Sequence, residues 1–439
     1  MLFHIIRKIN RRLFHPQIQC RFGSPQGIKP DSEGTQVGSI PSSSSEEEGH
    51  REESYFRRKS AKFIGAIFFS ICLIMVAVAF WPFNFKPVNK VSWLHNRNGV
   101  NFYGQAMILS PPLWDGDDPL KSPFQNKSIT IELLLRPSTE YSDVGIGRIL
   151  SFYDGYEPDV LFLGQWRNHL VIWSRLQIIQ NRFQKPVKRR DFSEIGLSKA
   201  LPKDKDQFMT ITSGIGGSSI YINGKLARAY PNYNVLSGFA GTPCQLVLGN
   251  SPNGGGYWTG YLSGLAIYNQ TLTPSQVLKS YQEWIDKGSP STPRDNGCIA
   301  LYLFNERKGD IVYNHMDNGS HLKIPEVFKP LSRNILSTQW IPFNWDRSAL
   351  QDISINIVGF VPFGFICAAF LIKTKRLRKS ILFLATALIG LGFSMVIELV
   401  QVYLPTRDSS LTDVICNTLG TITGLILFHT TNYFSQKYQ

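Results

Sequence analysis

Polar side chains recur at helical spacing in the C-terminal part of the chain, inside segments that are otherwise apolar. Polar and ionisable groups are costly in lipid, so they mark functional sites or structural pairs there. Glu398 or Asp413 could act as a general acid or base, and Arg407 could steady a phosphate or another anion. We expect one polar membrane pocket, with eight members: Asp352, Asn356, Glu398, Gln401, Arg407, Ser410, Asp413 and Asn417.

Spacing and depth both support this convergence. Asp352 and Asn356 are four residues apart, as are Asp413 and Asn417, and side chains at this spacing share one face of a helix. A helix rises about 1.5 Å per residue, which puts these four groups and Glu398 near the same end of three spans. We therefore expect them in the same leaflet.

Each of these residues also has a structural interpretation. Ser410 and Asp413 fit a capping box, so Asp413 could simply begin a helix. Glu398 could pair with Arg407 only to hold the helices together, and Asn417 could be an interhelical contact. A stabilising pair does not need five polar groups at one depth, so the set as a whole favours a functional pocket.

Four apolar stretches are long enough to cross a hydrocarbon core as helices. The first stretch, Phe63–Trp81, contains 19 residues without a charge. The other three are approximately Ile353–Ile372, Ser380–Tyr403 and Leu411–His429. The sequence therefore predicts a four-helix transmembrane bundle, with helices at 61–83 and within 346–430.

Basic residues determine the expected orientation. The chain has 46 Lys and Arg against 32 Asp and Glu, a net charge of +14, and no nucleic-acid-binding motif accounts for the excess. Basic clusters stay cytoplasmic, and they precede the first span and fill the loop between spans two and three. Both ends of the chain are then cytoplasmic, and 84–345 lies outside. We expect a multi-pass protein of the plasma (inner) membrane.

The N-terminal residues 1–60 are basic and polar. Residues 1–16 mix apolar and basic residues, as a short interfacial helix does, although a dispensable tail is the favoured interpretation. Residues 23–54 are rich in Ser, Gly, Pro and Glu, which predicts a disordered linker. Residues 431–439 are expected to form a cytoplasmic tail.

The long segment between spans one and two alternates short strand-like runs with turn residues. Asn223-Gly224 is a strong hairpin signal, because both positions of a type I′ turn need positive φ. A short amphipathic helix is predicted over Ser275–Trp284. The predicted strands are Ser128–Leu135, Arg148–Tyr153, Val160–Gly164, His169–Ser174, Phe208–Thr212, Ser219–Ile222, Gln245–Gly249, Tyr261–Tyr268 and Ile299–Phe304. Strands at this spacing indicate an all-β sandwich.

Six segments in order carry a resemblance to a known fold. They are SITIELLLRP from Ser128, RILSFYDG from Arg148, LFLGQ from Leu161, IYINGKL from Ile220, the run from Leu246 to Val277, and YQEW from Tyr281. Together, over about 91–285, they resemble a laminin-G-like or concanavalin A-like jelly roll. The resemblance implies a domain that binds glycans or proteins, since only a minority of such domains are glycosidases.

Catalysis by the jelly roll is not expected. A retaining glycosidase needs two carboxylates about 5–5.5 Å apart, and Glu132 stands alone on its strand. Glycan binding would depend on aromatic residues that stack on sugar rings, but such residues could instead fill the core. The candidates for glycan binding are Trp166, Tyr257 and Trp258, whereas we expect Trp173 in the core.

Metal and disulfide chemistry is sparse in this segment. A lone acid such as Asp154 is usually a turn residue, so we expect no metal, and no nucleotide or flavin signature indicates a cofactor. Cys244 and Cys298 are the two cysteines outside the membrane and the cytoplasm. They could form a disulfide that ties two strands together, or remain buried thiols.

The C-terminal part resembles the VanZ-like family. The residues that carry the resemblance follow the pattern D-x3-N-x3-F-x-P-x-G from Asp352, E-x2-Q from Glu398, P-x-R from Pro405, S-x2-D from Ser410 and N-x2-G from Asn417. It covers about 341–430 and the first span. The resemblance implies a small helical membrane domain of the cell envelope; the family name comes from teicoplanin resistance. The repeats WPFN from Trp81 and IPFN from Ile341 bracket the large insert.

The fold class we expect is therefore mixed: a four-helix VanZ-like bundle with an extracytoplasmic jelly roll inserted between spans one and two. The favoured function is binding of a glycan or envelope polymer by the jelly roll, with a lipid head group or lipid-linked precursor in the polar pocket. The alternative is a membrane enzyme that uses the acids above, and a protein partner stays open. A transporter ranks last, because four spans with polar groups at one end offer no continuous path.

Overall fold

The computed structural model describes residues 43–114, 122–138, 145–156, 159–176, 192–239, 241–291, 293–316, 320–333, 335–336, 347–375, 377–405, 407 and 409–437. The chain divides into two compact units, one made of residues up to Val78 with 346–395 and 413–439, and the other of 79–345 with 396–412. Residues 1–42 lie outside the described residues, and so does the interfacial helix considered for 1–16.

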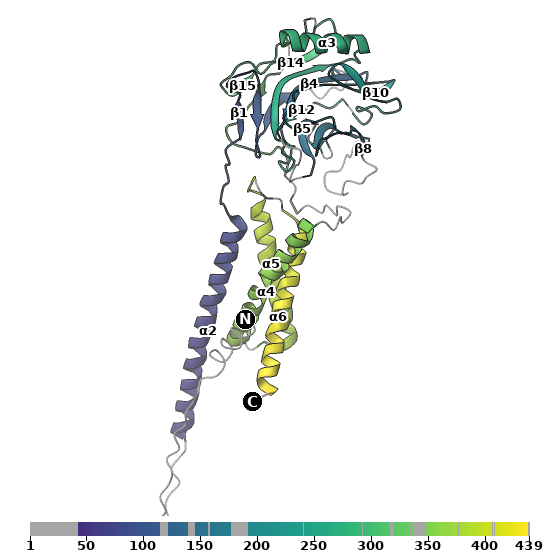
Figure 1. Ribbon diagram of the computed structural model, residues 1–439. Helices are drawn as coiled ribbons and strands as arrows, with labels where there is room; N and C mark the ends of the chain where they lie inside the picture. Colours follow the sequence, from purple (N-terminus) through teal and green to yellow (C-terminus); the bar gives the residue numbers. More distant parts are fainter. Residues whose placement is uncertain are drawn as a thin grey trace, which may run out of the picture. The chain divides into compact units, whose positions relative to one another are not determined.

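The β-rich unit is a sandwich of two antiparallel sheets (Figure 1). The first sheet has the order β1 (Val91–Trp93), β2 (Val100–Phe102), β13 (Gly260–Tyr268), β4 (Ile129–Pro137), β9 (Gln207–Gly214), β10 (Gly217–Ile222) and β11 (Lys225–Tyr230), and β14 (Cys298–Tyr302) also pairs with β13. The second sheet has the order β15 (Ile311–Val312), β16 (Leu322–Lys323), β3 (Ile108–Pro112), β12 (Gln245–Leu248), β5 (Gly147–Tyr153), β6 (Leu161–Trp166), β7 (His169–Arg175) and β8 (Phe192–Leu197).

Alternating apolar residues build the core between the sheets. Ile131 and Leu133 of β4 face Leu161 and Leu163 of β6 across a single buried cluster. Each predicted strand is present, with its bounds shifted by a few residues at most. The predicted Asn223-Gly224 turn is confirmed, with φ of 51° and 74°.

Helix α3 (Pro274–Lys287) covers the first sheet (Figure 1). Thr273 caps its first turn in a capping box with Gln276, and Gly288 in the left-handed region ends it. Trp284 packs over Gly264, where a β-carbon would collide with the indole. The sandwich continues to β16, so it extends beyond the expected core of 91–285.

Four helices among the described residues are long and apolar enough to cross a membrane, over Arg58–Phe80, Leu350–Lys375, Lys379–Gln401 and Leu411–Phe434. They belong to α2 (Ser43–Phe80), α4 (Arg347–Lys375), α5 (Lys379–Gln401) and α6 (Leu411–Lys437). The predicted mixed fold is thus confirmed: an all-β sandwich between one N-terminal and three C-terminal apolar helices.

Two boundaries differ from the prediction. Disorder over 23–54 is wrong for residues 43–54, which are already part of α2. Glu and Arg have high helix propensity, and extending the apolar helix into them avoids the cost of nucleating a new one. At the other end, α6 continues to Lys437, through most of the expected tail of 431–439.

Close backbone contacts join α4 and α6. A β-carbon added at Gly364, Gly420 or Gly424 would collide with a backbone carbonyl of the facing helix. Without a hydrophobic driving force between helices in lipid, small residues at such contacts allow tight packing. These glycines therefore place the polar residues of α4 and α6 at their observed distances.

Candidate functional site

The outer face of the second sheet presents aromatic and charged side chains. Leu161 and Leu163 of β6 point into the core, so Phe162 and Trp166 point outward by the two-residue period of a strand. The register pairs Phe162 with Trp173 on β7. An aromatic surface therefore runs across β6 and β7, on the side away from the core; Phe162 is only 3% exposed in it and supports its neighbours.

Trp173 is the centre of this surface. Its indole stacks on Phe192 of β8, with ring centroids 4.1 Å apart and planes 11° apart, and tilts against Phe162 at 5.2 Å. Its Nε1 donates to Glu194 Oε2 at 2.8 Å. The side chain is half-buried on the outer face, so the expectation that Trp173 belongs to the core is wrong.

Trp166 extends the surface to the tip of the β6–β7 hairpin. Its side chain is 45% exposed. His169 stacks on the indole at 5.4 Å between centroids, and the Arg167 guanidinium lies 5.0 Å from the ring centre. Exposed indole with hydrogen-bonding groups beside it is an arrangement that can stack on a sugar ring and bind its hydroxyls.

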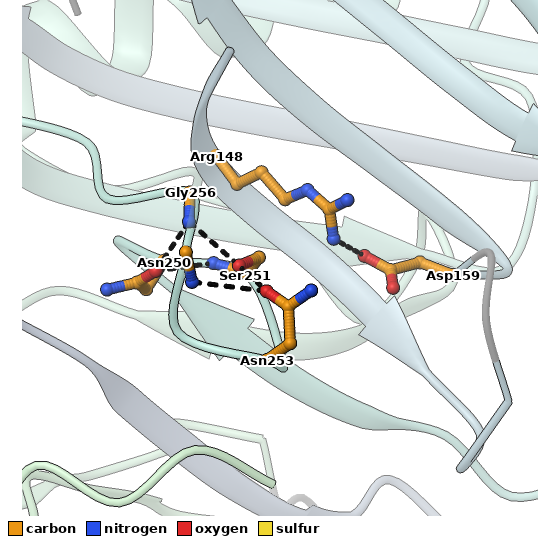
Figure 2. Close-up of polar contacts among 7 residues, drawn as sticks. Arg148, Asp159, Asn250, Ser251, Asn253 and Gly256 are labelled. Carbon is orange, nitrogen blue, oxygen red and sulfur yellow. Dashed lines mark hydrogen bonds and ion pairs between the residues drawn. The ribbon is translucent and has the colours of Figure 1, made fainter. Parts of the chain in front are cut away.

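An ion pair borders the surface on β5. Arg148 Nη1 lies 2.6 Å from Asp159 Oδ2, and its guanidinium covers Phe162 at 4.3 Å (Figure 2). The Asp159 side chain is almost fully buried, whereas that of Arg148 keeps 22% exposure. Arg148 therefore presents charge at the surface while its partner fixes its position.

The loop after β12 fits against this ion pair and is held by its own side chains (Figure 2). Asn250 Oδ1 and Ser251 Oγ both accept from the Gly256 amide, at 3.2 and 2.9 Å. Asn253 Oδ1 accepts from Ser251 Oγ and from the Gly255 amide. The Gly256 carbonyl in turn accepts from Arg148 N at 2.9 Å, so the loop is fixed to β5.

The two other predicted glycan-binding residues follow this loop. Trp258 is 2% exposed in the core, and its Nε1 donates to Gln165 Oε1 at 2.7 Å. Its assignment as a glycan-binding candidate is therefore wrong, because no ligand can reach the indole. Tyr257 is half-buried and remains a candidate.

The Asp154 carboxylate is bound by protein groups. Its carboxylate forms an ion pair with the buried Arg175 guanidinium, and its Oδ2 also accepts from Thr242 at 3.1 Å. A guanidinium thus already lies against this carboxylate. Among the described residues, no group of three or more His, Cys, Asp or Glu side chains could hold a metal.

Glu132 is buried beneath α3. Its Oε2 accepts from Tyr268, Ser280 and Trp284 at 2.9 to 3.0 Å, and its Oε1 has no hydrogen-bond partner. Burial raises the pKa of this carboxyl, and the three hydrogen bonds oppose the rise. Glu132 is fully buried, so it attaches α3 to the sheet and contacts no solvent-borne ligand.

Of the two alternatives for Cys244 and Cys298, a disulfide or buried thiols, the structure has buried thiols. Cys244 lies beside the second sheet, where its thiol donates to Thr242 O, and Cys298 lies in β14 of the first sheet, where its thiol donates to Ala300 O. Both thiols are free and buried. Burial raises the pKa of Cys298 to about 12, so neither position favours a reactive thiolate.

In the helical unit, two polar pairs link the helices. Asn356 Nδ2 of α4 donates to Asp413 Oδ1 of α6 at 2.8 Å, and Asn417 Nδ2 of α6 donates to Ser394 Oγ of α5 at 2.9 Å. Asn417 Oδ1 is buried without a partner. Asp352 is exposed one turn before Asn356.

Polar side chains at the end of α5 and in the loop before α6 bond to backbone atoms. Glu398 Oε2 accepts from the Ser410 amide at 2.9 Å. Gln401 Nε2 donates to Ala79 O at 3.0 Å, and Arg407 Nη2 donates to Trp81 O at 3.4 Å. Arg407 thus satisfies a carbonyl just beyond the end of α2, where a cation is favoured; its role as the counter-charge of Glu398 stays a prediction. Convergence of all eight polar residues stays a prediction.

Family comparisons agree with this architecture. Residues 278–432 match the family model of VanZ/LLP1, and residues 117–278 match that of the concanavalin A-like lectin/glucanases superfamily. Both expected resemblances are confirmed. The first match begins inside α3, so the region matching VanZ/LLP1 includes the last strands of the sandwich as well as α4–α6.

Solved structures share parts of the fold at low identity. A putative carbohydrate binding protein from Bacteroides ovatus is 13% identical, with TM-score 0.35, over 55% of this chain and 63% of its own. The binding domain of botulinum neurotoxin DC, solved with rat synaptotagmin II, is 15% identical, with TM-score 0.33, over 45% of each chain. The chain thus spans about half the length of these proteins. No curated protein matches it.

The sequence alone did not predict that this surface includes Phe162, Phe192, Glu194 and the Arg148–Asp159 pair. The signal for Phe162 was present, because it alternates with Leu161 and Leu163. Phe192 and Glu194 lie on β8, a strand that was not predicted, so no pattern placed them beside Trp173.

Proposed function

We propose that this protein is an integral membrane protein of the cell envelope whose sandwich binds a glycan on the outer face of the second sheet. The observation that carries the proposal is the aromatic surface of β6–β8, with Trp166 45% exposed at one end. Trp173 pairs in register with Phe162, four residues before Trp166, so the two indoles are separated by roughly 13 Å along the strands. That length suits an oligosaccharide better than a single sugar.

The polar groups beside the indoles support a hydroxyl-rich ligand. Glu194 is an acceptor, whereas Arg148, Arg167 and His169 are donors. Both an acceptor and donors thus lie along the surface, which suits the hydroxyl groups of a neutral glycan. The folded loop beside Arg148 keeps this arrangement fixed before a ligand binds, which lowers the entropic cost of binding.

The helical unit is proposed to serve the same envelope role. The resemblance to VanZ/LLP1 and the polar pairs on α4–α6 support binding of a lipid head group or a lipid-linked precursor there. Basic residues flanking the spans support an orientation with the sandwich outside the cytoplasm. A membrane enzyme that uses Glu398 or Asp413 with Arg407 is the alternative proposal, although Arg407 donates to a backbone carbonyl.

The direct test is binding of the purified full-length protein to a panel of envelope polysaccharides and their oligosaccharides. Trp166→Ala and Trp173→Ala should each weaken binding by roughly 30-fold, the loss of about 2 kcal/mol expected at an aromatic anchor. Tyr313→Ala is the matched control, since Tyr313 is 50% exposed beyond β15, the opposite edge of the sheet. Binding that survives both Trp substitutions would refute the proposed surface.

A further inference from the structure

A second surface lies on the segment that enters the sandwich. Large apolar side chains are exposed along it, although none belongs to the glycan-binding surface. Their exposed fractions range from 47% to 70%, and the residues are Trp81, Phe83, Phe85, Val88 and, on the strand-end turn beside them, Tyr103. Five large exposed apolar side chains on and beside residues 81–90 indicate an interaction site.

Hydrogen bonds of Asn89 fix the outward direction of Lys86, Val88 and Lys90. Asn89 is buried, its side chain bonds Met107 N and O and Pro325 O, and its amide donates to Glu326 O. Pro87 is also buried, whereas Lys86, Val88 and Lys90 are exposed. The extended segment therefore presents one face of two lysines and a valine, and it cannot turn this face inward without breaking the Asn89 contacts.

Basic charge accompanies the apolar groups. The Lys90 ammonium lies 5.7 Å from the centre of the Tyr103 ring, and Lys86 is exposed on the same face. On the returning segment, Val327 pairs with Val88, and Lys329 is exposed two residues later. Aromatic residues with lysines are the composition of surfaces that insert into the head-group region of a bilayer.

Chain connectivity determines the partner. The apolar span ends at Phe80, and Phe85 follows five residues later, so at most about 18 Å of extended chain separates them. Lys90 is ten residues after the span, which allows about 35 Å at full extension. Any surface on this segment thus remains within reach of the bilayer that the span crosses.

We propose that residues 81–90 together with Tyr103 form a membrane-docking edge of the sandwich that binds the surface of a bilayer containing anionic lipid. The aromatic side chains enter the head-group region, and Lys86, Lys90 and Lys329 attract anionic head groups. Docking would restrict rotation of the sandwich about its tether. The inference is independent of glycan binding.

The test uses the full-length protein in nanodiscs, with a spin label attached to Val88→Cys or to Tyr103→Cys. The rate at which the label collides with oxygen, and with a nickel chelate, is measured at each position. Oxygen concentrates in lipid and the chelate in water. In discs with phosphatidylglycerol, both positions should favour oxygen. Ile215→Cys is the matched control, because Ile215 is 96% exposed in the β9–β10 turn, separated from β1 by several strands. The protein without an added cysteine gives the background signal.

Charge reversal separates docking from simple proximity. Lys86→Glu with Lys90→Glu should lower the docked-to-undocked ratio by at least about fivefold per lysine, the factor for about 1 kcal/mol per charge near an anionic surface. Lys225→Glu with Arg228→Glu, on the exposed β11 edge, changes the net charge equally and should have no effect. Equal nickel access at positions 88, 103 and 215, or equal docking in phosphatidylcholine discs, would overturn the proposal.

Discussion

Glu132 offers a test of how α3 is attached to the sandwich. Glu132→Ala would leave the Tyr268, Ser280 and Trp284 donors buried without an acceptor. Each such group costs roughly 1–3 kcal/mol, so the variant should lose about 3 kcal/mol or more. For a domain of this size that lowers Tm by about 6–12 °C.

Glu132→Gln is the matched control. The amide oxygen can still accept from the same three donors, and the Thr210 hydroxyl on the paired strand has no partner and can accept from the new amide. We expect a loss of about 1 kcal/mol or less at neutral pH. Thermal unfolding of the full-length protein, followed by Trp fluorescence, measures both variants, with Trp284 as a local probe.

The pH dependence has a definite sign. Burial raises the pKa of Glu132 in the folded protein above the unfolded value of about 4.3, so the folded state binds the proton more tightly. The stabilisation that Glu132 contributes through this pKa difference is fully present below the unfolded pKa. It is lost as the pH rises through the folded pKa. The wild-type protein should therefore lose stability relative to Glu132→Gln as the pH rises above the unfolded pKa of about 4.3 and through the raised folded pKa. A constant difference, or equal losses for the Ala and Gln variants, would refute the reasoning.

Two further predictions concern packing and thiols. Gly364→Ala should destabilise the helical unit by about 1–3 kcal/mol, because its β-carbon would collide with the Thr421 carbonyl. Gly392→Ala, which has nothing within 4 Å of its β-carbon, should leave the Tm of the purified protein unchanged; equal effects would contradict the close α4–α6 contact. Reductant should leave the Tm unchanged, and Cys244 and Cys298 should react with maleimide only after unfolding. A fall in Tm on reduction would instead indicate a disulfide.

The sequence predicted most of the fold because strand and span signals are local. Alternation within a strand identified β4 to β7, and Asn223-Gly224 identified a turn whose backbone needs positive φ. The short β15 and β16 have two residues each, too few for a two-residue period to be recognised. Their position depends on pairing with β3, which the local sequence does not specify.

The candidate site was less predictable because it depends on which face a residue occupies. Trp173 follows Leu170 and Ile172, whose alternation points it outward, so its sequence did contain the signal. Trp258 precedes β13 in a loop without a period, and only the tertiary contact with Gln165 places it in the core. Cys244 and Cys298 look alike in sequence, but Cys244 directly precedes β12 of the second sheet, whereas Cys298 begins β14 of the first.

Both ends of the inserted sandwich contact the same short connection between α5 and α6. Gln401 and Arg407 bind Ala79 and Trp81 on the entering side. On the leaving side, Arg333 donates to the Val402 carbonyl, and the Leu336 amide donates to Ser409 at 3.2 Å. A domain whose two attachment points are fixed side by side can be exchanged for another, or deleted and replaced by a few residues, without lengthening the path between its neighbours. The architecture is thus suited to acquiring new specificity by recombination, because the helices need not change when the inserted domain does.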